Sequence, residues 1–139
     1  MLPFTTAARD KNITLKTELF PGLAEIDVDT ERMQLVLANL IGNAVRYTPT
    51  GGTVFVRARP RDTATVLEVQ DTGPGIPKQY HTAVFDKFFR MPGSGSGGAG
   101  LGLYIAKEIT MAHGARLSLQ SEAGHGSLFS IELPTATAA

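Results

Sequence analysis

The chain has 139 residues, in which 13 basic and 13 acidic side chains give a formal net charge of zero at pH 7. This length suits one domain with a buried core, and the even charge balance excludes the broad positive surface that attracts nucleic acid or an anionic membrane. The lack of cysteine excludes disulfides and thiolate metal sites. Residues 1–11 hold no apolar stretch as long as a signal peptide or a membrane span. We therefore expect a soluble, cytoplasmic domain with no nucleic-acid partner.

Hydrophobic periodicity and the positions of proline and glycine predict pairs of strands separated by helices. The expected strands are 13–20, 24–28, 53–59, 65–70, 116–121 and 127–133, and the expected helices are 30–47 and 100–113, with a helical turn at 78–84. This order predicts an α+β fold, a two-layer α/β sandwich. Its mixed, largely antiparallel sheet of about five strands should be covered on one face by about three helices. Residues 1–10 would be an N-terminal extension, 11–134 the domain and 135–139 a frayed tail.

Asp71 stands at the end of an expected strand and begins the segment DTGPGIP (71–77). The strand period of two places Asp71 on the same face as Leu67 and Val69, so its carboxylate should point toward the interior. An ionised carboxylate only accepts hydrogen bonds, which favours the exocyclic amine of adenine over the carbonyl of guanine. Glycines at 73 and 75 would let the backbone approach a flat ligand closely. The structural alternative is that Asp71 only starts an Asx turn.

The expected helix 30–47 carries two asparagines beside its apolar stripe. At about 100° per residue, one wedge of roughly 60° holds Arg32, Asn39, Asn43 and Arg46. The adjoining apolar stripe consists of Met33, Val36, Leu37, Leu40 and Ala44. Asparagine is a mediocre helix former, so the presence of two asparagines beside the apolar stripe needs an explanation. The two amides could bond the ends of neighbouring strands, or Asn43 could direct its carbonyl oxygen at Mg²⁺, which takes oxygen ligands and often retains nucleotide phosphates.

A second glycine cluster, MPGSGSGGAG (91–100), leads into the expected helix 100–113. The unpaired N–H groups of a helix N-terminus attract phosphate, and glycines allow its oxygens to approach. The GxGxxG matches within this run are weak, because no strand directly precedes them. The sequence also lacks a GK[ST] P-loop lysine and the HRD and DFG motifs of common protein kinases. A flexible linker is the structural alternative, although linkers rarely lead directly into an amphipathic helix.

Five ordered motifs resemble those of one protein family. The motifs are NLIGNAVRYTP (39–49), DTGPGIP (71–77), VFDKFFR (84–90), GGAGLGLYIAKEI (97–109) and GHGSLFSIELP (124–134). They are similar to the N box, first glycine box, F box, second glycine box and terminal strands of the catalytic ATP-binding domain of bacterial two-component sensor histidine kinases. This domain belongs to the superfamily shared with gyrase, the ninety-kilodalton heat-shock chaperone and the mismatch-repair ATPases. The resemblance covers about residues 11–134 and implies a Bergerat-type ATP fold.

The resemblance also implies roles for individual residues, with ATP and Mg²⁺ as cofactors. Asp71 would bind the adenine amine and Asn43 would ligate Mg²⁺, while Asn39, Lys87 and Arg90 would act near the transferred phosphate. Further nucleotide-binding positions would be Arg46, Tyr47, Gly73, Gly75, Ile76, Gly98, Gly100, Leu101 and Gly102. The segment 76–99 would form a mobile ATP lid, and Phe85, Phe88 and Phe89 would anchor the F box.

The identity of residue 39 favours one chemistry within this superfamily. Hydrolytic relatives carry a glutamate four residues before the Mg²⁺ asparagine, whereas this chain has Asn39, which cannot act as a general base. Phosphoryl transfer depends mostly on positioning and charge neutralisation. The resemblance thus implies that the domain holds Mg-ATP until an acceptor histidine arrives.

The three histidines, His81, His113 and His125, are all outside a helical acceptor motif of the family's kind, and each is expected to be structural. The acceptor would then lie on a separate helical dimerisation domain of the same kinase, with a response regulator downstream. We expect the isolated domain to be monomeric and the full-length protein to be anchored in the cell membrane.

Other functions stay open from the sequence. Ala99 stands where the family often has a hydroxyl residue, and the missing acceptor leaves room for a nucleotide-responsive interaction module without catalysis. A serine kinase of the anti-sigma-factor type would share the pocket. A gyrase-like hydrolase is disfavoured by Asn39.

Overall fold

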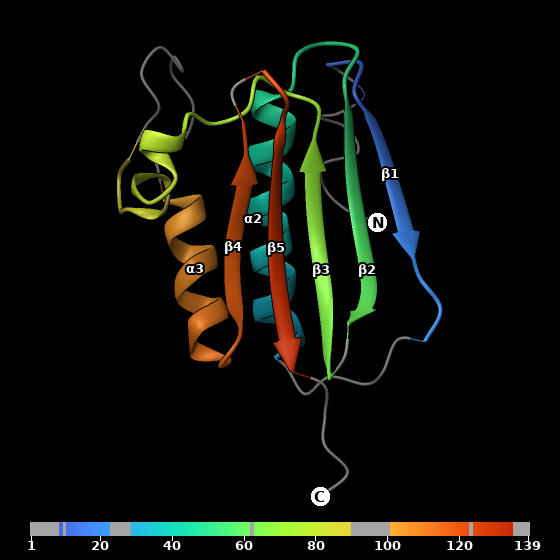
Figure 1. The fold of residues 1–139 in the computed structure, drawn as a ribbon, viewed down its shortest axis with the longest axis vertical. Helices are drawn as coiled ribbons and strands as arrows, with labels where there is room; N and C mark the ends of the chain where they lie inside the picture. The colour runs from blue at the N-terminus through green and yellow to red at the C-terminus, as the bar shows by residue number, and fades with distance from the viewer. Residues whose placement is uncertain are drawn as a thin grey trace, which may run out of the picture.

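The computed structural model describes residues 9, 11–22, 29–61, 63–89, 101–122 and 124–134. These residues form one five-stranded sheet in the order β1-β2-β3-β5-β4 (Figure 1). The strands are β1 (Thr14–Leu19), β2 (Thr53–Arg61), β3 (Ala64–Asp71), β4 (Arg116–Ser121) and β5 (Ser127–Pro134). The helices are α2 (Thr30–Tyr47) and α3 (Gly102–Ala112), with 3-10 turns η1 (Lys78–Tyr80) and η2 (Ala83–Phe85).

The sheet is mixed and largely antiparallel, as the sequence predicts. β1 pairs with β2 in parallel, whereas the β2–β3, β3–β5 and β4–β5 pairs are antiparallel. Helices α2 and α3 lie on one face of the sheet, where α2 runs behind β5 and also contacts β3, and α3 lies at the β4 side (Figure 1). The predicted two-layer α+β sandwich is therefore confirmed.

Some element boundaries differ from the predicted ones. The helix expected from residue 100 begins at Gly102, and the helical turn expected over 78–84 is divided into η1 and η2. β2 continues through Pro60 to Arg61, although the sequence favours a turn there. β1 pairs with β2 only as far as Ala58, so the missing N–H of Pro60 faces a side of β2 without a described partner strand. The expected strand 24–28 lies outside the described residues.

The core lies between the sheet and the two helices. From α2 it contains Met33, Val36, Leu40 and Ala44, as the predicted apolar stripe requires, and Leu37 is half-buried beside them. The sheet contributes Phe129, Ile131 and Leu133 of β5, which are at most 1% exposed. Burial of side chains of this size contributes about 1.5–3 kcal/mol each, so the contact of α2 with β5 and β3 fixes the helix position.

Both ends of α2 are held by specific hydrogen bonds. At the start, the Asp29 side chain accepts from the Arg32 N–H (3.1 Å), and the Asp29 N–H donates to His113 Nε2 (3.1 Å) at the end of α3. At the other end, the buried Thr48 donates from Oγ1 to the Ala44 carbonyl (2.6 Å). Lys11 Nζ donates to the Val45 carbonyl (3.0 Å) and to the Arg46 carbonyl. These contacts set the position of the α2 C-terminus.

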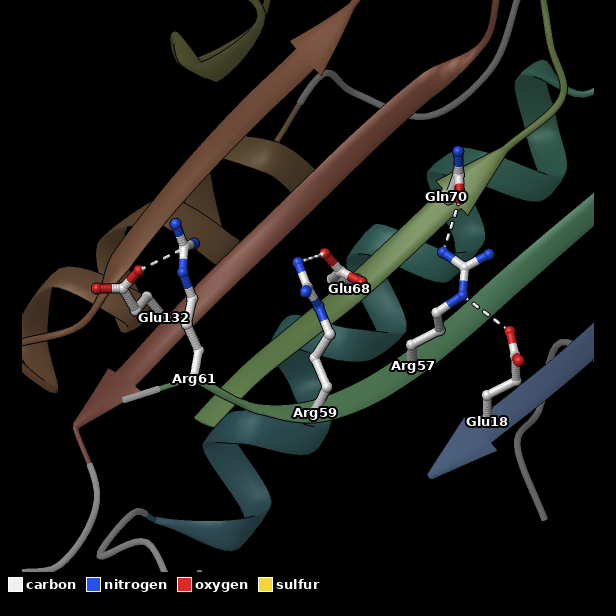
Figure 2. Close-up of polar contacts among 7 residues, drawn as sticks. All are labelled: Glu18, Arg57, Arg59, Arg61, Glu68, Gln70 and Glu132. Carbon is white, nitrogen blue, oxygen red and sulfur yellow. Dashed lines mark hydrogen bonds and ion pairs between the residues drawn. The ribbon is translucent and has the colours of Figure 1, made fainter. Parts of the chain in front are cut away.

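The second face of the sheet is covered by arginine side chains paired with acids (Figure 2). The pairs are Arg57 with Glu18 (2.8 Å), Arg59 with Glu68 (2.9 Å) and Arg61 with Glu132 (3.6 Å). Val66 lies opposite Arg59 in the strand register and is only 1% exposed. The arginine stems therefore shield apolar surface while their charged ends are neutralised.

Candidate functional site

The site predicted from the sequence gathers at one end of the sandwich. The C-terminal ends of α2 and β3 lie there, and the chain after β3 crosses this end toward η1, η2 and the start of α3 (Figure 1). Because α2 and α3 run in opposite directions, the C-terminus of one lies at the same end as the N-terminus of the other.

Asp71 is the buried carboxylate of this end of the sheet. It is 6% exposed, and its Oδ1 accepts the Gly73 N–H at 2.9 Å. Burial raises the pKa of the Asp71 carboxyl, and backbone N–H groups of Gly73 and Ser127 lower it in part. The carboxylate is interior, as the strand period predicts, and it also closes the local turn that the structural alternative requires. It retains acceptor capacity toward a ligand donor, since a carboxylate has about four lone-pair sites.

Glycines let the backbone close around Asp71. A Cβ at Gly73 would lie 3.0 Å from both Asp71 Oδ1 and the Tyr47 carbonyl oxygen, so the end of α2 touches the loop. Gly126 has φ +80°, and a Cβ there would lie 2.2 Å from the Asp71 carbonyl oxygen. The sequence prediction missed Gly126 and Ser127 as neighbours of Asp71. The two glycines that flank His125 in the fifth motif were the signal that could have indicated a close backbone contact there.

Asn39 and the first residue of α3 form a second part of the site. The Asn39 Oδ1 lies 3.4 Å from where a Gly102 Cβ would be, which is an ordinary contact distance, so the start of α3 lies directly beside Asn39. The Asn39 Nδ2 is buried, and no residue of the described part of the chain bonds it. Such an amide donor is costly without a partner, and it is therefore suited to a ligand oxygen. Asn43, one turn further along α2, is half-buried.

The N-terminus of α3 has no side-chain cap within the described residues. Leu101 precedes the helix and Gly102 begins it, so the first N–H groups of α3 are positioned for an anion. Arg90, Gly98 and Gly100, which the motifs predict for this part of the site, lie outside the described residues.

Cationic and aromatic side chains flank the site. The Arg46 guanidinium lies 5.9 Å from the Tyr47 ring centroid, and Lys87 Nζ lies 5.8 Å from the ring centroid of Tyr104 on α3. Lys87 is exposed. These positions leave two cations near the ends of α2 and α3.

The three phenylalanines of the F box differ in their roles. Phe85 packs edge-on against the core residue Phe129 (6.0 Å between ring centroids), and Phe89 lies 5.8 Å from Tyr80. Phe88 is 63% exposed and has φ 65°. The prediction that all three anchor the segment is therefore wrong for Phe88, because the left-handed backbone turns this side chain outward.

Among the residues described, no group of three or more histidine, cysteine, aspartate and glutamate side chains could hold a metal ion. The oxygen donor at this end of the fold that the sequence assigns to a metal is the Asn43 side chain. None of the described helices is long and apolar enough to cross a membrane.

The described residues thus bring a buried carboxylate at the end of a central strand, an asparagine-bearing helix and a helix N-terminus without a described side-chain cap to one end of an α/β sandwich. Residues 28–137 match the family described as histidine kinase-, DNA gyrase B- and HSP90-like ATPases, and the chain belongs to this family. The resemblance drawn from the motifs is thereby confirmed.

The relatives of the chain are sensor histidine kinases. The alginate biosynthesis sensor protein KinB of Pseudomonas aeruginosa is 34% identical over 94% of this chain, and the hybrid signal transduction histidine kinase D of Dictyostelium discoideum is 37% identical over 94%. The chain spans 22% and 9% of the lengths of these two proteins.

Solved structures agree with this grouping. The catalytic domain of histidine kinase ThkA has a TM-score of 0.82 at 27% identity, with 96% of this chain and 88% of that one covered. Full-length ShkA in complex with AMPPNP has a TM-score of 0.87 at 33% identity, with 98% of this chain and 28% of that one covered. The fold is that of histidine kinase catalytic domains.

Proposed function

We propose that the chain binds Mg-ATP and supplies the γ-phosphate for autophosphorylation of a histidine on a separate dimerisation domain of a sensor histidine kinase. The observation that carries this proposal is the buried Asp71 carboxylate, placed at the same end of the fold as Asn39, Asn43 and the start of α3. The complex of ShkA with AMPPNP supports a nucleotide site in a protein of this fold.

Base selection would rest on Asp71. The carboxylate is buried and receives a backbone N–H from Gly73, and when ionised it can only accept further hydrogen bonds. The exocyclic amine of adenine donates to it, whereas the carbonyl of guanine at the same place would leave two acceptors facing each other. Adenine should therefore be strongly preferred.

Phosphate and metal binding would rest on the ends of the two helices. The buried Asn39 amide donor needs an oxygen partner, and α3 begins beside it at Gly102 with its first N–H groups. These features fit a triphosphate, and the Asn43 carbonyl oxygen is of the donor type that Mg²⁺ takes. When bound, Mg²⁺ would neutralise phosphate charge. Arg46, Tyr47, Gly73, Gly75, Ile76, Gly98, Gly100 and Leu101 complete the proposed nucleotide-binding set.

Transfer is favoured over hydrolysis because an amide stands at residue 39. Asn39 holds no proton-accepting group that could activate water. Lys87, and Arg90 beyond the described residues, would instead stabilise the charge that develops on the transferred group. Such a domain keeps ATP intact until an acceptor is presented.

The partners and location belong to the same proposal. The acceptor would be the helical dimerisation domain of the same kinase, and a response regulator would act downstream; histidine kinase ThkA, a structural neighbour at 26% identity, has been solved in complex with its response regulator TrrA. We propose a cytoplasmic, monomeric catalytic domain in a full-length protein that is anchored in the membrane.

Calorimetric titration of the chain with ATP and Mg²⁺ tests the proposal. The substitution Asp71→Asn keeps the side-chain shape but removes the charged acceptor, and it should weaken ATP binding by about tenfold to 100-fold. The control Glu31→Gln removes an exposed carboxylate in the first turn of α2, at the other end of that helix from the site, and should leave the affinity unchanged. Equal affinities for ATP and GTP, or full ATP binding by Asp71→Asn, would contradict the proposal.

A further inference from the structure

The hydroxyl of Ser121, the last residue of β4, joins two backbone segments that are far apart in the sequence. It accepts the Ile76 N–H at 2.7 Å and donates to the Gly126 carbonyl at 2.8 Å. Ser127 Oγ lies 3.2 Å away. A hydroxyl has one proton and two acceptor sites, so the Ser127 hydroxyl supplies the proton in this third contact. The described partners of Ser121 thus lie in the segment after β3 and around the start of β5.

The β5 side of this contact is bonded directly to Asp71. Ser127 lies opposite Asp71 in the register of β3 and β5, and its backbone N–H bonds the Asp71 carboxylate. Gly126 lies so close that a Cβ on it would be 2.2 Å from the Asp71 carbonyl oxygen. Because this contact is between backbone groups and not flexible side chains, the start of β5 holds a fixed position relative to the carboxylate.

The other side of the contact is the glycine segment 72–77, which follows β3. Its turn at Gly75 has φ +76°, and a Cβ there would lie 2.1 Å from the Glu122 carbonyl oxygen, so the segment fits closely against the chain just after β4. Ile76 follows this turn, and its side chain packs against the core. One side-chain atom, Ser121 Oγ, therefore joins the far end of the glycine segment to the β5 backbone beside the buried carboxylate.

We propose that Ser121 is a positioning residue for base recognition, whose hydroxyl holds the glycine segment fixed relative to Asp71 so that the base enters a preformed site. This inference rests on the proposed function, in which Asp71 accepts from adenine and Gly75 and Ile76 belong to the nucleotide-binding set. Hydrogen bonds are directional, and a site that is fixed before binding loses less conformational entropy when the ligand enters. Without the hydroxyl, the segment and the carboxylate should move relative to each other, and the base should bind more weakly.

The place of the Ser121 hydroxyl predicts which part of the nucleotide is affected. Adenosine and ATP carry the same base, so loss of the hydroxyl should weaken both equally and leave the ratio of their affinities unchanged. Threonine keeps the hydroxyl and suits a strand, so it separates the role of the hydroxyl from a general effect of substitution. Ser121 borders an open hollow of about 640 Å³, where the additional methyl group of threonine meets no packed core.

The test measures, in the whole chain, the affinities for adenosine and Mg-ATP by NMR titration and amide hydrogen exchange at Ile76. Ser121→Ala should weaken the binding of both ligands by about threefold to tenfold, the worth of one hydrogen bond. It should also speed exchange at the Ile76 N–H, which loses its acceptor. Ser121→Thr should bind both ligands as the unsubstituted chain does. Ser118→Ala removes an exposed hydroxyl on the other face of β4, and as the matched control it should change none of these quantities.

The outcomes separate the two proposals. If the unsubstituted chain binds ATP but Ser121→Ala keeps both affinities within about twofold, a change below the worth of one hydrogen bond, the positioning role is overturned and the proposed function stands. A loss confined to ATP would also overturn this role, because the base would then bind normally. So would an equal loss in Ser121→Thr, because the hydroxyl would not be its cause. If the unsubstituted chain binds no ATP, both proposals fail.

Discussion

At the scale of single residues, Asp71 combines two demands that usually oppose each other. Its burial raises the pKa of the carboxyl above the ordinary value of 3.8, which favours the neutral acid, whereas recognition of adenine needs the ionised form. The N–H groups of Gly73 and Ser127 reduce this conflict because they stabilise the charge. The donor of the base would stabilise it further.

This conflict predicts two opposite pH dependences. ATP affinity should rise as pH increases through the raised pKa of Asp71, because only the ionised carboxylate accepts from adenine. Without nucleotide, the folded state binds the proton more tightly than the unfolded state. The contribution of Asp71 to the free energy of unfolding should therefore be greatest below pH 3.8, the ordinary pKa of this carboxyl. This contribution should fall as the pH rises through the pKa of the folded state.

Calorimetry and urea unfolding at a series of pH values measure these two dependences. Asp71→Asn cannot titrate, so its profiles should lack both changes. If the unfolding profile of Asp71→Asn parallels that of the unsubstituted chain across this range, the titrating group is not Asp71.

At the scale of elements, the sequence predicted the helices and strands well where the periodicity is strong. The apolar stripe of α2 and the alternation of β5 set those elements with nearly the observed bounds. The hydrogen bonds between elements were not predictable in this way. Ser121 and Ile76 are 45 residues apart, and no local pattern indicates that a serine at a strand end will accept from a particular backbone N–H. Phe88 was also misjudged, because its exposure follows from a left-handed backbone that composition does not reveal.

The arginine-covered face of the sheet allows a prediction about stability. Glu68 is 5% exposed and pairs with Arg59, whereas the side chains of Arg61 and Glu132 are 59% and 46% exposed. Arg59→Met keeps the apolar stem but leaves a buried carboxylate without its cation, so it should cost about 1–3 kcal/mol. Arg61→Met breaks an exposed pair and should cost about 0.5 kcal/mol or less.

Urea unfolding of both variants at neutral pH and low salt measures the difference. Equal losses of stability in Arg59→Met and Arg61→Met would contradict the expectation that burial of Glu68 makes its ion pair contribute more than the exposed pair. A gain in stability for Arg59→Met would show that the apolar stem alone covers Val66 sufficiently.

At the scale of the whole molecule, the proposed function makes the chain the ATP-binding part of a reaction that needs a second domain. A phosphoacceptor helical domain added in trans with ATP and Mg²⁺ should acquire phosphate on its histidine. With ATP labelled at the γ-phosphate, no label should appear on that domain when its histidine is replaced by glutamine. Label on a serine of a partner protein would indicate a serine kinase, no label would indicate an interaction module, and rapid phosphate release without an acceptor would indicate a hydrolase.

The contact between the two helices also decides what His113 can do. Its Nε2 takes the Asp29 N–H at 3.1 Å, and its Nδ1 faces the Ile109 carbonyl at 2.9 Å, so Nδ1 holds the proton and the lone pair of Nε2 is already engaged. A phosphoryl group can join an imidazole only through such a lone pair. Phosphorylation of His113 would thus first have to break the hydrogen bond from the residue that caps α2, which makes this histidine a poor nucleophile for as long as that bond is formed.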